Sequence, residues 1–267
     1  MNVSLYVELF IAGTIIGSFV GALTYRIPRG IDIVKGRSKC PSCKKTIAWY
    51  DNVPLISYII LKGRCRKCSL IISRRYFIIE LATGLYFLFL YFLSKTFFCS
   101  ASMSPYCSWV DVLGKNSFLL NIFIFLILFS IFIIDIEKQV IPDTLIFWGI
   151  SIAAGLIILF FPNAFYFSIF SGLIAASFLL FINLFTKGKG MGLGDVKLAI
   201  FAGLLLVWPL IGIWLFIAFL TGAIVGIILI LGRKTSFGKS IAFGPFLVFS
   251  FFLVYFLGDK ILPLLFR

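Results

Sequence analysis

The sequence contains no histidine. Ser-His-Asp and Cys-His catalysis both use an imidazole as the general base, so neither mechanism is available to this chain. Metal sites that depend on histidine ligands are excluded for the same reason, and the HExxH zinc proteases are among them. Any catalysis must therefore rest on other side chains.

Charged residues are also scarce. They make up 13% of the 267 residues, whereas hydrophobic residues make up 61%, above the roughly one half that is usual for soluble domains. Apolar runs of roughly 18 to 22 residues recur, each long enough to cross a hydrocarbon core about 30 Å thick. The short alternating segments of transmembrane barrels are absent. The composition predicts an all-α polytopic membrane protein.

Eight membrane spans are predicted, at residues 5–25, 76–93, 117–134, 144–161, 165–185, 196–210, 211–231 and 241–257. The first ten residues lack a basic segment and include Glu8, so we expect the first span to be retained rather than cleaved as a signal peptide. The region 196–231 is too long for one span. We place a turn at Trp208-Pro209, because Pro209 has no backbone N–H to donate.

Basic residues are concentrated after the first span. Of the 24 Lys and Arg, 13 lie between Arg26 and Arg75, which by the positive-inside rule indicates a cytoplasmic segment. The formal charge of +14 raises nucleic acid as a partner, but no nucleic-acid-binding motif accompanies it, and anionic lipid is the expected partner. We therefore predict a first helix (1–25), a cytoplasmic insert (26–75) and a seven-helix membrane domain (76–267).

Two CxxC pairs lie in this insert, Cys40 with Cys43 and Cys65 with Cys68, separated by 21 residues. This spacing is typical of zinc ribbons, in which four thiolates complete a tetrahedron and leave no open position. The sequence therefore predicts a structural zinc, which a segment too short for a large core would need. Free thiols or a redox CxxC are the alternatives.

The remaining cysteines, Cys99 and Cys107, fall in a predicted outer loop. Oxidation is permitted on that side of the membrane, so a disulfide and two free thiols both fit the sequence. Neither residue is expected to bind the metal.

Only ten acidic residues are present, and ionisable side chains at a membrane span mark function by default. Asp135 ends the third span, and Asp195 opens the sixth after Gly192 and Gly194, at the same inner boundary. Two adjacent carboxyl groups cannot both ionise easily, so one can act as a base on water while the other donates a proton. The glycines would allow close approach to Asp195. The alternative is a flexible loop with Asp195 as a helix cap.

Three further charged residues accompany these two. Lys197 is expected to support the site, together with Gly192 and Gly194. Asp143 starts the fourth span, either as a cap that complements the helix dipole or as a supporting residue near Asp135. Glu80 lies inside the second span, where it forms a salt bridge to a neighbouring arginine or has a functional role.

Nearly the whole chain resembles the bacterial type IV prepilin peptidases. The resemblance is carried by Gly17-Ser18-Phe19 and Tyr25-Arg26-Ile27-Pro28, by the CxxC pairs with Trp49-Tyr50-Asp51-Asn52 and Ile72-Ser73-Arg74-Arg75, by Asp135 to Asp143, by Gly192-Leu193-Gly194-Asp195, and by Phe243-Gly244-Pro245-Phe246. The chain departs from the family pattern at three positions: Gly21, where Asn is frequent, and Phe77 and Ala242, where Pro is frequent.

The resemblance implies a bifunctional enzyme of the bacterial inner membrane. It implies cleavage of the short basic leader of prepilins or pseudopilins at the cytoplasmic face by Asp135 and Asp195, in the manner of GxGD aspartic proteases. Methylation of the new N-terminus from S-adenosylmethionine would follow, with Glu80 in the associated region. The alternatives are a proton-coupled transporter, whose site would lie nearer the midplane, and a non-catalytic scaffold, which leaves Asp195 unexplained.

Overall fold

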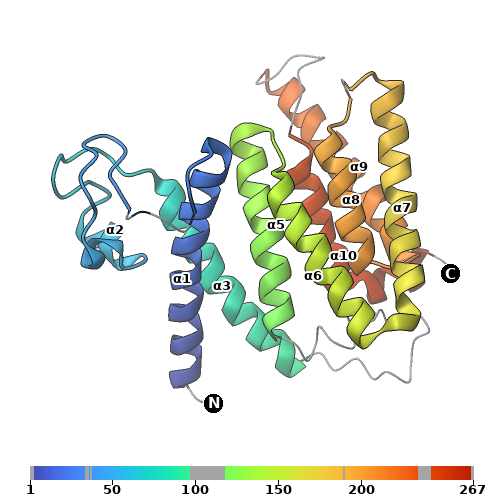
Figure 1. Cartoon of the computed structure of the whole chain (residues 1–267), viewed down its shortest axis with the longest axis horizontal. Helices are drawn as coiled ribbons and strands as arrows, with labels where there is room; N and C mark the ends of the chain where they lie inside the picture. The colour runs from blue at the N-terminus through green and yellow to red at the C-terminus, as the bar shows by residue number, and fades with distance from the viewer. Residues whose placement is uncertain are drawn as a thin grey trace. The chain divides into compact units, whose positions relative to one another are not determined.

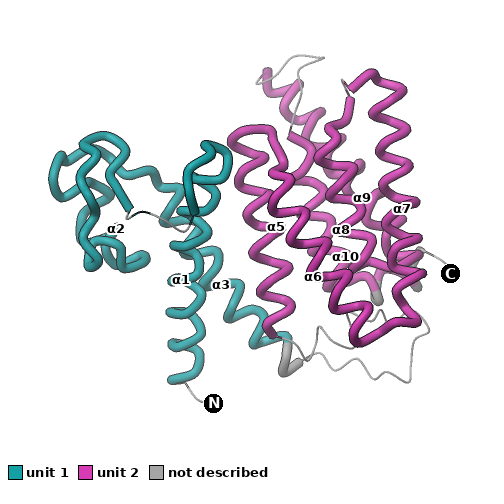
Figure 2. The backbone as a smooth tube through the Cα atoms, viewed as in Figure 1, with its two compact units in different colours: residues 1–98 teal, residues 99–267 magenta. Residues whose placement is uncertain are grey.

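The computed structural model describes residues 3–33, 36, 38–96, 118–188, 190–233 and 242–265. Cys99 and Cys107 lie outside these residues, so the disulfide and the two free thiols both stay open for this pair. The chain forms two compact units, Met1–Phe98 and Cys99–Arg267, which Figure 2 shows in teal and magenta. Each unit is described below by itself.

Unit 1 is built on two long helices, α1 (Val3–Arg26) and α3 (Arg74–Thr96), which pack along each other (Figure 1). Glycine makes this close approach possible: a Cβ on Gly17 would collide with Thr83 Oγ1 and would lie 2.8 Å from the Cα of Glu80. Small residues at such crossings let two membrane helices gain contact area between their backbones.

The segment between α1 and α3 contains little regular structure. It includes the 3-10 helices η1 (Ile27–Arg29) and η2 (Trp49–Asn52), the short helix α2 (Ile56–Ile60) and two isolated antiparallel bridges, Lys39 to Thr46 and Arg64 to Ile71. Each bridge closes the turn that contains one CxxC pair. The segment is thus two similar knuckles joined by η2 and α2.

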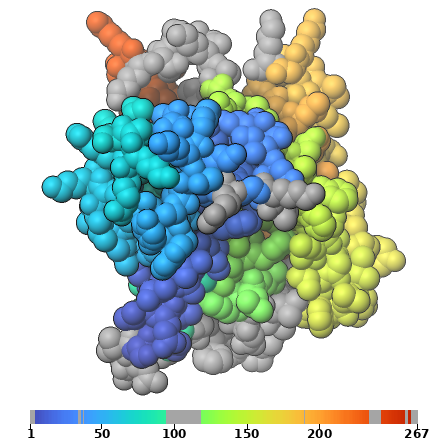
Figure 3. All heavy atoms as spheres, turned by 60° about the vertical axis from the view of Figure 1, so that its left-hand side comes forward, coloured from blue at the N-terminus to red at the C-terminus, as the bar shows by residue number. Residues whose placement is uncertain are grey.

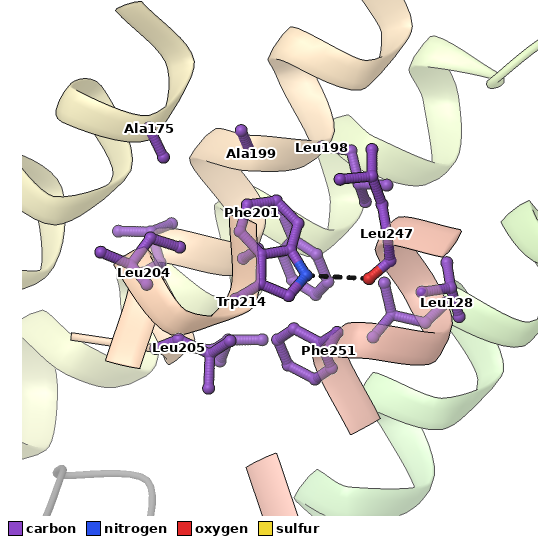
Figure 4. Close-up of a cluster of buried hydrophobic side chains, with 14 of the residues drawn as sticks. Leu128, Ala175, Leu198, Ala199, Phe201, Leu204, Leu205, Trp214, Leu247 and Phe251 are labelled. Atoms are coloured by element: carbon purple, nitrogen blue, oxygen red, sulfur yellow. Dashed lines mark hydrogen bonds between the residues drawn. The ribbon is translucent and has the colours of Figure 1, made fainter. Parts of the chain in front are cut away.

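Unit 2 is a helical bundle of α5 (Phe118–Lys138), α6 (Asp143–Phe160), α7 (Pro162–Phe185), α8 (Leu193–Leu205), α9 (Leu210–Leu231) and α10 (Gly244–Leu265). Phe201, Trp214 and Phe251 fill its centre and are almost completely buried (Figure 4). The indole N–H of Trp214 donates to the Leu247 carbonyl at 2.8 Å, so this large ring is buried without an unpaired donor.

Glycine contacts bring α7 and α8 together in the same way. A Cβ on Gly203 would collide with the backbone of Gly172, so the two helices touch at their main chains. Next to this contact, the Ser171 hydroxyl accepts a hydrogen bond from the Trp208 N–H, in the turn that follows α8. The short helix α8 is therefore held at the centre of unit 2.

Six of the described helices are long and apolar enough to cross a membrane: α1, α3, α5, α6, α7 and α9. α8, with 13 residues, and the apolar stretch Gly244–Gly258 of α10 are shorter. Each of these helices overlaps a predicted span in position, but only six of the eight predicted spans have the length of a membrane-crossing helix in the described part of the chain. The all-α membrane fold is confirmed. α8 ends at Leu205 and α9 begins at Leu210, so the chain does divide at Trp208-Pro209.

Candidate active site and metal centre

Asp135 lies in the last turn of α5, and its side chain is buried, with 5% exposed. The backbone N–H of Gly244, the first residue of α10, donates to Asp135 Oδ2 at 2.9 Å. A larger residue at that position would displace the carboxylate, because a Cβ on Gly244 would lie 2.6 Å from Oδ2. Pro245 follows at a position where a helix needs no backbone donor. The Phe-Gly-Pro sequence therefore brings the start of α10 against the carboxylate.

Asp195 is the third residue of α8 and is equally buried, with 7% exposed. Its Oδ2 accepts a hydrogen bond of 3.1 Å from the backbone N–H of Gly192, which caps the helix. This contact is one half of a capping box in which Gly192 is the N-cap and Asp195 the third helical residue, so Asp195 is not itself the cap that the alternative predicted. Gly194 fits closely against the loop before α6: a Cβ there would lie 2.8 Å from the Cβ of Ile141.

The structure brings the two aspartates together. Their carboxyl groups, from α5 and α8, are close enough to interact electrostatically. Each uses Oδ2 to accept a glycine N–H, whereas Oδ1 has no hydrogen-bond partner within the described part of the chain. The pair is thus held in place by backbone donors, and one oxygen of each carboxyl group is left uncommitted.

The aspartate pair marks one end of unit 2. The end of α5 and the starts of α8 and α10 meet there, and the ends of α7 and α9 lie on the same side (Figure 1). Lys138, Lys187 and Arg233 occur at the ends of α5, α7 and α9 on this side. This end of unit 2 is therefore basic around a buried acidic pair.

Asp143 and Lys197, predicted as supporting residues, form an ion pair. Lys197 Nζ donates to Asp143 Oδ1 at 2.7 Å and links the first turn of α6 to α8, two residues after Asp195. Pro142 occupies the cap position of α6, so Asp143 pairs with a lysine rather than capping the helix. Both side chains are exposed, and such pairs contribute about 0–1 kcal/mol.

Glu80 is buried in α3 and connects three parts of unit 1. Its Oε2 accepts the backbone N–H of Leu55 at 2.8 Å, and Ser18 of α1 lies close enough to interact with its side chain. Arg75 donates to Thr24 Oγ1 at 2.6 Å, which joins the start of α3 to the end of α1. Sequence patterns did not indicate the partner Leu55, because this contact joins segments 25 residues apart.

The four cysteines of the CxxC pairs come together in unit 1. All four sulfur atoms lie within 4.8 Å of one another, and Cys40 Sγ lies 3.8 Å from Cys68 Sγ. A tetrahedral zinc with Zn–S bonds of about 2.3 Å places its sulfurs about 3.8 Å apart, so the four side chains fit this ion.

The two knuckles have the same hydrogen-bond pattern. Cys40 N–H donates to the Lys45 carbonyl and Cys65 N–H to the Leu70 carbonyl, five residues on in each case. The residues four after the first cysteines, Lys44 and Ser69, both adopt the left-handed conformation, with φ of 59° and 54°. Two similar turns, each presenting a pair of thiols, are the framework expected of a zinc ribbon.

The environment of the thiols favours a bound cation. The backbone N–H of Cys43 lowers the pKa of Cys40 to about 6 against the effect of burial. The backbone N–H of Leu70 also acts to lower the pKa of Cys68, but burial and the three neighbouring thiols raise it to about 11. The sulfurs therefore do not all ionise together by themselves, whereas a divalent metal would stabilise four thiolates.

An ion pair fixes the second knuckle to the rest of the segment. Arg66, between Cys65 and Cys68, donates from Nε and Nη2 to the Asp51 carboxylate at distances of 2.7 to 3.0 Å. Asp51 belongs to η2, so this two-pronged contact orients η2 against the knuckle. The side chain of Asp51 raises the pKa of Arg66, first through the hydrogen bond and then through its charge.

Both units match models of known protein families. A model of the bacterial peptidase A24 N-terminal domain matches residues 11–94, and a model of the type IV leader peptidase family matches residues 122–227. The chain belongs to the type IV leader peptidase family. The first model covers the four cysteines of unit 1, and the second covers both aspartates of unit 2. The resemblance seen in the sequence is confirmed.

Curated members of the type IV leader peptidase family are similar over most of the chain. A prepilin leader peptidase/N-methyltransferase of Vibrio cholerae is 36% identical over 72% of this chain and 74% of its own length. One of Klebsiella pneumoniae is 33% identical over 75% and 84%. One of Myxococcus xanthus is 32% identical over 84% of this chain and 63% of its own length. No solved structure matches the chain significantly.

Gly244 is the site residue that sequence reasoning missed. The segment Phe243-Gly244-Pro245-Phe246 carried part of the resemblance, but nothing local assigned it to Asp135, from which Gly244 is 109 residues distant. The available signal was a glycine directly before a proline at the start of an apolar helix. Such a glycine often marks a close backbone approach.

Proposed function

We propose that this protein is a membrane aspartic endopeptidase that removes the short basic leader of type IV prepilins or pseudopilins and then N-methylates the new N-terminal residue. The observation that carries the proposal is the buried pair Asp135 and Asp195, brought from two helices into electrostatic range, with one oxygen of each uncommitted among the described residues. Relatives that bear both activities in their names support the two-step assignment.

The pair has the parts that general acid-base hydrolysis of a peptide needs. One ionised carboxylate takes a proton from water as the water oxygen attacks the scissile carbonyl carbon, and the protonated partner donates its proton to the carbonyl oxygen. The tetrahedral intermediate then collapses: the C–N bond breaks as the leaving amine takes a proton from the first residue, and one hydroxyl of the intermediate returns its proton to the second residue as the new C=O forms. The N–H groups of Gly192 and Gly244 hold Oδ2 of each aspartate, which leaves Oδ1 for proton transfer.

The basic end of unit 2 supports cleavage at the cytoplasmic face of the bacterial inner membrane. Lys138, Lys187 and Arg233 lie at the end that contains the aspartate pair, and the positive-inside rule assigns such an end to the cytoplasm. The lysine- and arginine-rich segment 26–75 is assigned to the same compartment by the same rule.

The functional division proposed here has three parts: the first helix (1–25), a four-cysteine zinc domain (26–75) and a membrane domain that carries the cleavage site (76–267). Cys40, Cys43, Cys65 and Cys68 would hold one zinc, whose closed coordination stabilises the domain and supplies no catalytic position. S-adenosylmethionine would supply the methyl group. Glu80 belongs to the region associated with that step, where it joins α1, α3 and Leu55.

A prepilin peptide tests the proposal directly. The purified protein in liposomes is incubated with a peptide that spans the leader junction, with and without S-adenosylmethionine, and the products are weighed by mass spectrometry. We expect leader loss in both samples and a further methyl group only with the methyl donor. Intact peptide with wild-type protein, or equal cleavage by Asp195→Asn, would contradict the proposal.

The face of cleavage is tested separately. Inside-out and right-side-out vesicles that contain the protein receive the same impermeant peptide. Cleavage in inside-out vesicles alone is expected, because only there does the cytoplasmic face meet the added peptide. Cleavage in right-side-out vesicles alone would reverse the assignment.

A further inference from the structure

The short helix α2 carries a row of apolar side chains that no described residue of unit 1 covers. Ile56, Ile59 and Ile60 are 57%, 64% and 68% exposed, and their spacing places them on one face of the helix. Ser57, off this face, is buried and donates to the Tyr50 carbonyl of η2. Three exposed isoleucines in a segment predicted to be cytoplasmic need an explanation, because clustered apolar surface marks an interaction site.

Two contacts fix the depth of α2 beside α3. The N–H of Leu55, directly before α2, donates to Glu80, and the ring of Tyr58 packs on Phe77 with the centroids 5.3 Å apart. Both partners belong to the membrane-span candidate α3, and Glu80 lies six residues after Arg74. At 1.5 Å per residue, this is about 9 Å along the helix axis.

This depth is comparable to the thickness of the polar layer of a bilayer. The headgroup region adds roughly 5–7 Å on each side of the hydrocarbon core, so with Arg74 at the surface, Leu55 is held near the hydrocarbon boundary. Figure 1 shows α2 at the level of the first turns of α3 rather than beyond its end. The exposed face of α2 therefore lies at the same depth as the first turns of α3, the neighbouring candidate membrane span.

The residues around α2 also suit a lipid interface. Trp49 is 76% exposed on η2, and tryptophan is enriched at the boundary between headgroups and acyl chains. Lys62 and Arg64 follow α2 and are exposed, in a segment with 13 basic residues. Long basic side chains near a membrane boundary extend to lipid phosphates. Figure 3 turns this connecting segment, in blue and cyan, toward the viewer.

We propose that α2 is an interfacial helix: Ile56, Ile59 and Ile60 insert among lipid acyl chains in the leaflet that holds the start of α3. Trp49 sits at the headgroup boundary, and Lys62 and Arg64 contact lipid phosphate. The zinc knuckles are thereby fixed against the membrane surface by α2 and by both flanking helices. The segment 26–75 is then a module seated on the bilayer rather than one that moves freely in the cytoplasm.

Photo-crosslinking in a defined bilayer tests this placement. p-Benzoylphenylalanine replaces Ile59 or Ile60 in the full chain, which is placed in nanodiscs of phosphatidylglycerol and phosphatidylethanolamine. Lys44, exposed in the first zinc knuckle, is the matched negative position, and Phe170, exposed in the middle of α7, is the positive one. After irradiation we expect phospholipid adducts at positions 59, 60 and 170, severalfold more than at position 44.

Two outcomes would overturn the proposal. One is a crosslink from positions 59 and 60 to a second copy or to another segment of the chain in place of lipid. The other is adduct formation at position 170 with none at 59 and 60. A second measurement leaves α2 unaltered. The fluorescence of Trp49 is obtained as the difference between wild type and Trp49→Phe. This difference should be smaller in lipids with brominated acyl chains than in ordinary lipids. A difference signal unchanged by bromine contradicts an interfacial Trp49.

Discussion

The polar groups buried in unit 1 are closed off by the protein, whereas those buried in unit 2 are left partly open. In unit 1, Glu80 accepts the Leu55 N–H and lies beside Ser18, and the four cysteine sulfurs converge within 4.8 Å of one another. In unit 2, Asp135 and Asp195 each keep one oxygen without a partner within the described residues. A closed polar site stabilises a fold, and an open one can act on a substrate.

The largest effect is expected from the open site. Asp135→Asn and Asp195→Asn keep side-chain size and a hydrogen-bond acceptor for the glycine N–H, but neither can act as acid or base. Leader cleavage should fall by about 10²–10⁴-fold, the usual contribution of such groups. Initial rates with a prepilin peptide measure this. Asp143→Asn is the matched control, because its carboxylate is exposed and paired with Lys197, and it should retain most activity.

The closed site is broken by Cys40→Ser. We expect wild-type protein to hold about one zinc per chain and this variant to hold much less, because one of four thiolates is lost. Amide hydrogen exchange should rise throughout residues 38–73, while the core around Trp214 stays protected. Metal analysis and exchange on the same sample measure both. Fully active wild-type protein without any metal would refute a structural zinc.

Gly244→Ala tests whether the backbone contact at Gly244 positions Asp135 in the open site. The added methyl group would lie 2.6 Å from Asp135 Oδ2 and must displace the carboxylate, so cleavage should fall by at least about tenfold, as for other misplaced catalytic groups. Zinc content in unit 1 should not change. Gly155→Ala, also in a helix but with open space around it, is the control and should cleave normally. Equal rates for both variants would show that Gly244 does not position Asp135.

The smallest effect is expected from Glu80→Gln. Glutamine offers the same oxygen to the Leu55 N–H, so a closed, structural contact survives the loss of charge. Cleavage should stay within about twofold of wild type, since no proton-transfer group is removed. A loss as large as that of Asp195→Asn would place Glu80 with the open site instead.

Patterns within short stretches of sequence predicted most of the fold. Run length and apolar content predicted the spans, since a helix that crosses a bilayer must satisfy its own backbone and cover it with apolar side chains. The missing N–H of Pro209 predicted the turn between α8 and α9. The CxxC spacing predicted four converging thiols, because each knuckle forms within ten residues.

Only the tertiary structure showed which distant groups meet. Gly244 reaches Asp135 across 109 residues, Leu55 reaches Glu80 across 25, and Lys197 reaches Asp143 across 54. The sequence placed Asp135 and Asp195 at the same membrane boundary, but it did not say which oxygen of each would stay uncommitted. Local patterns determine where helices begin and end, whereas the partners of their end groups depend on how the helices pack.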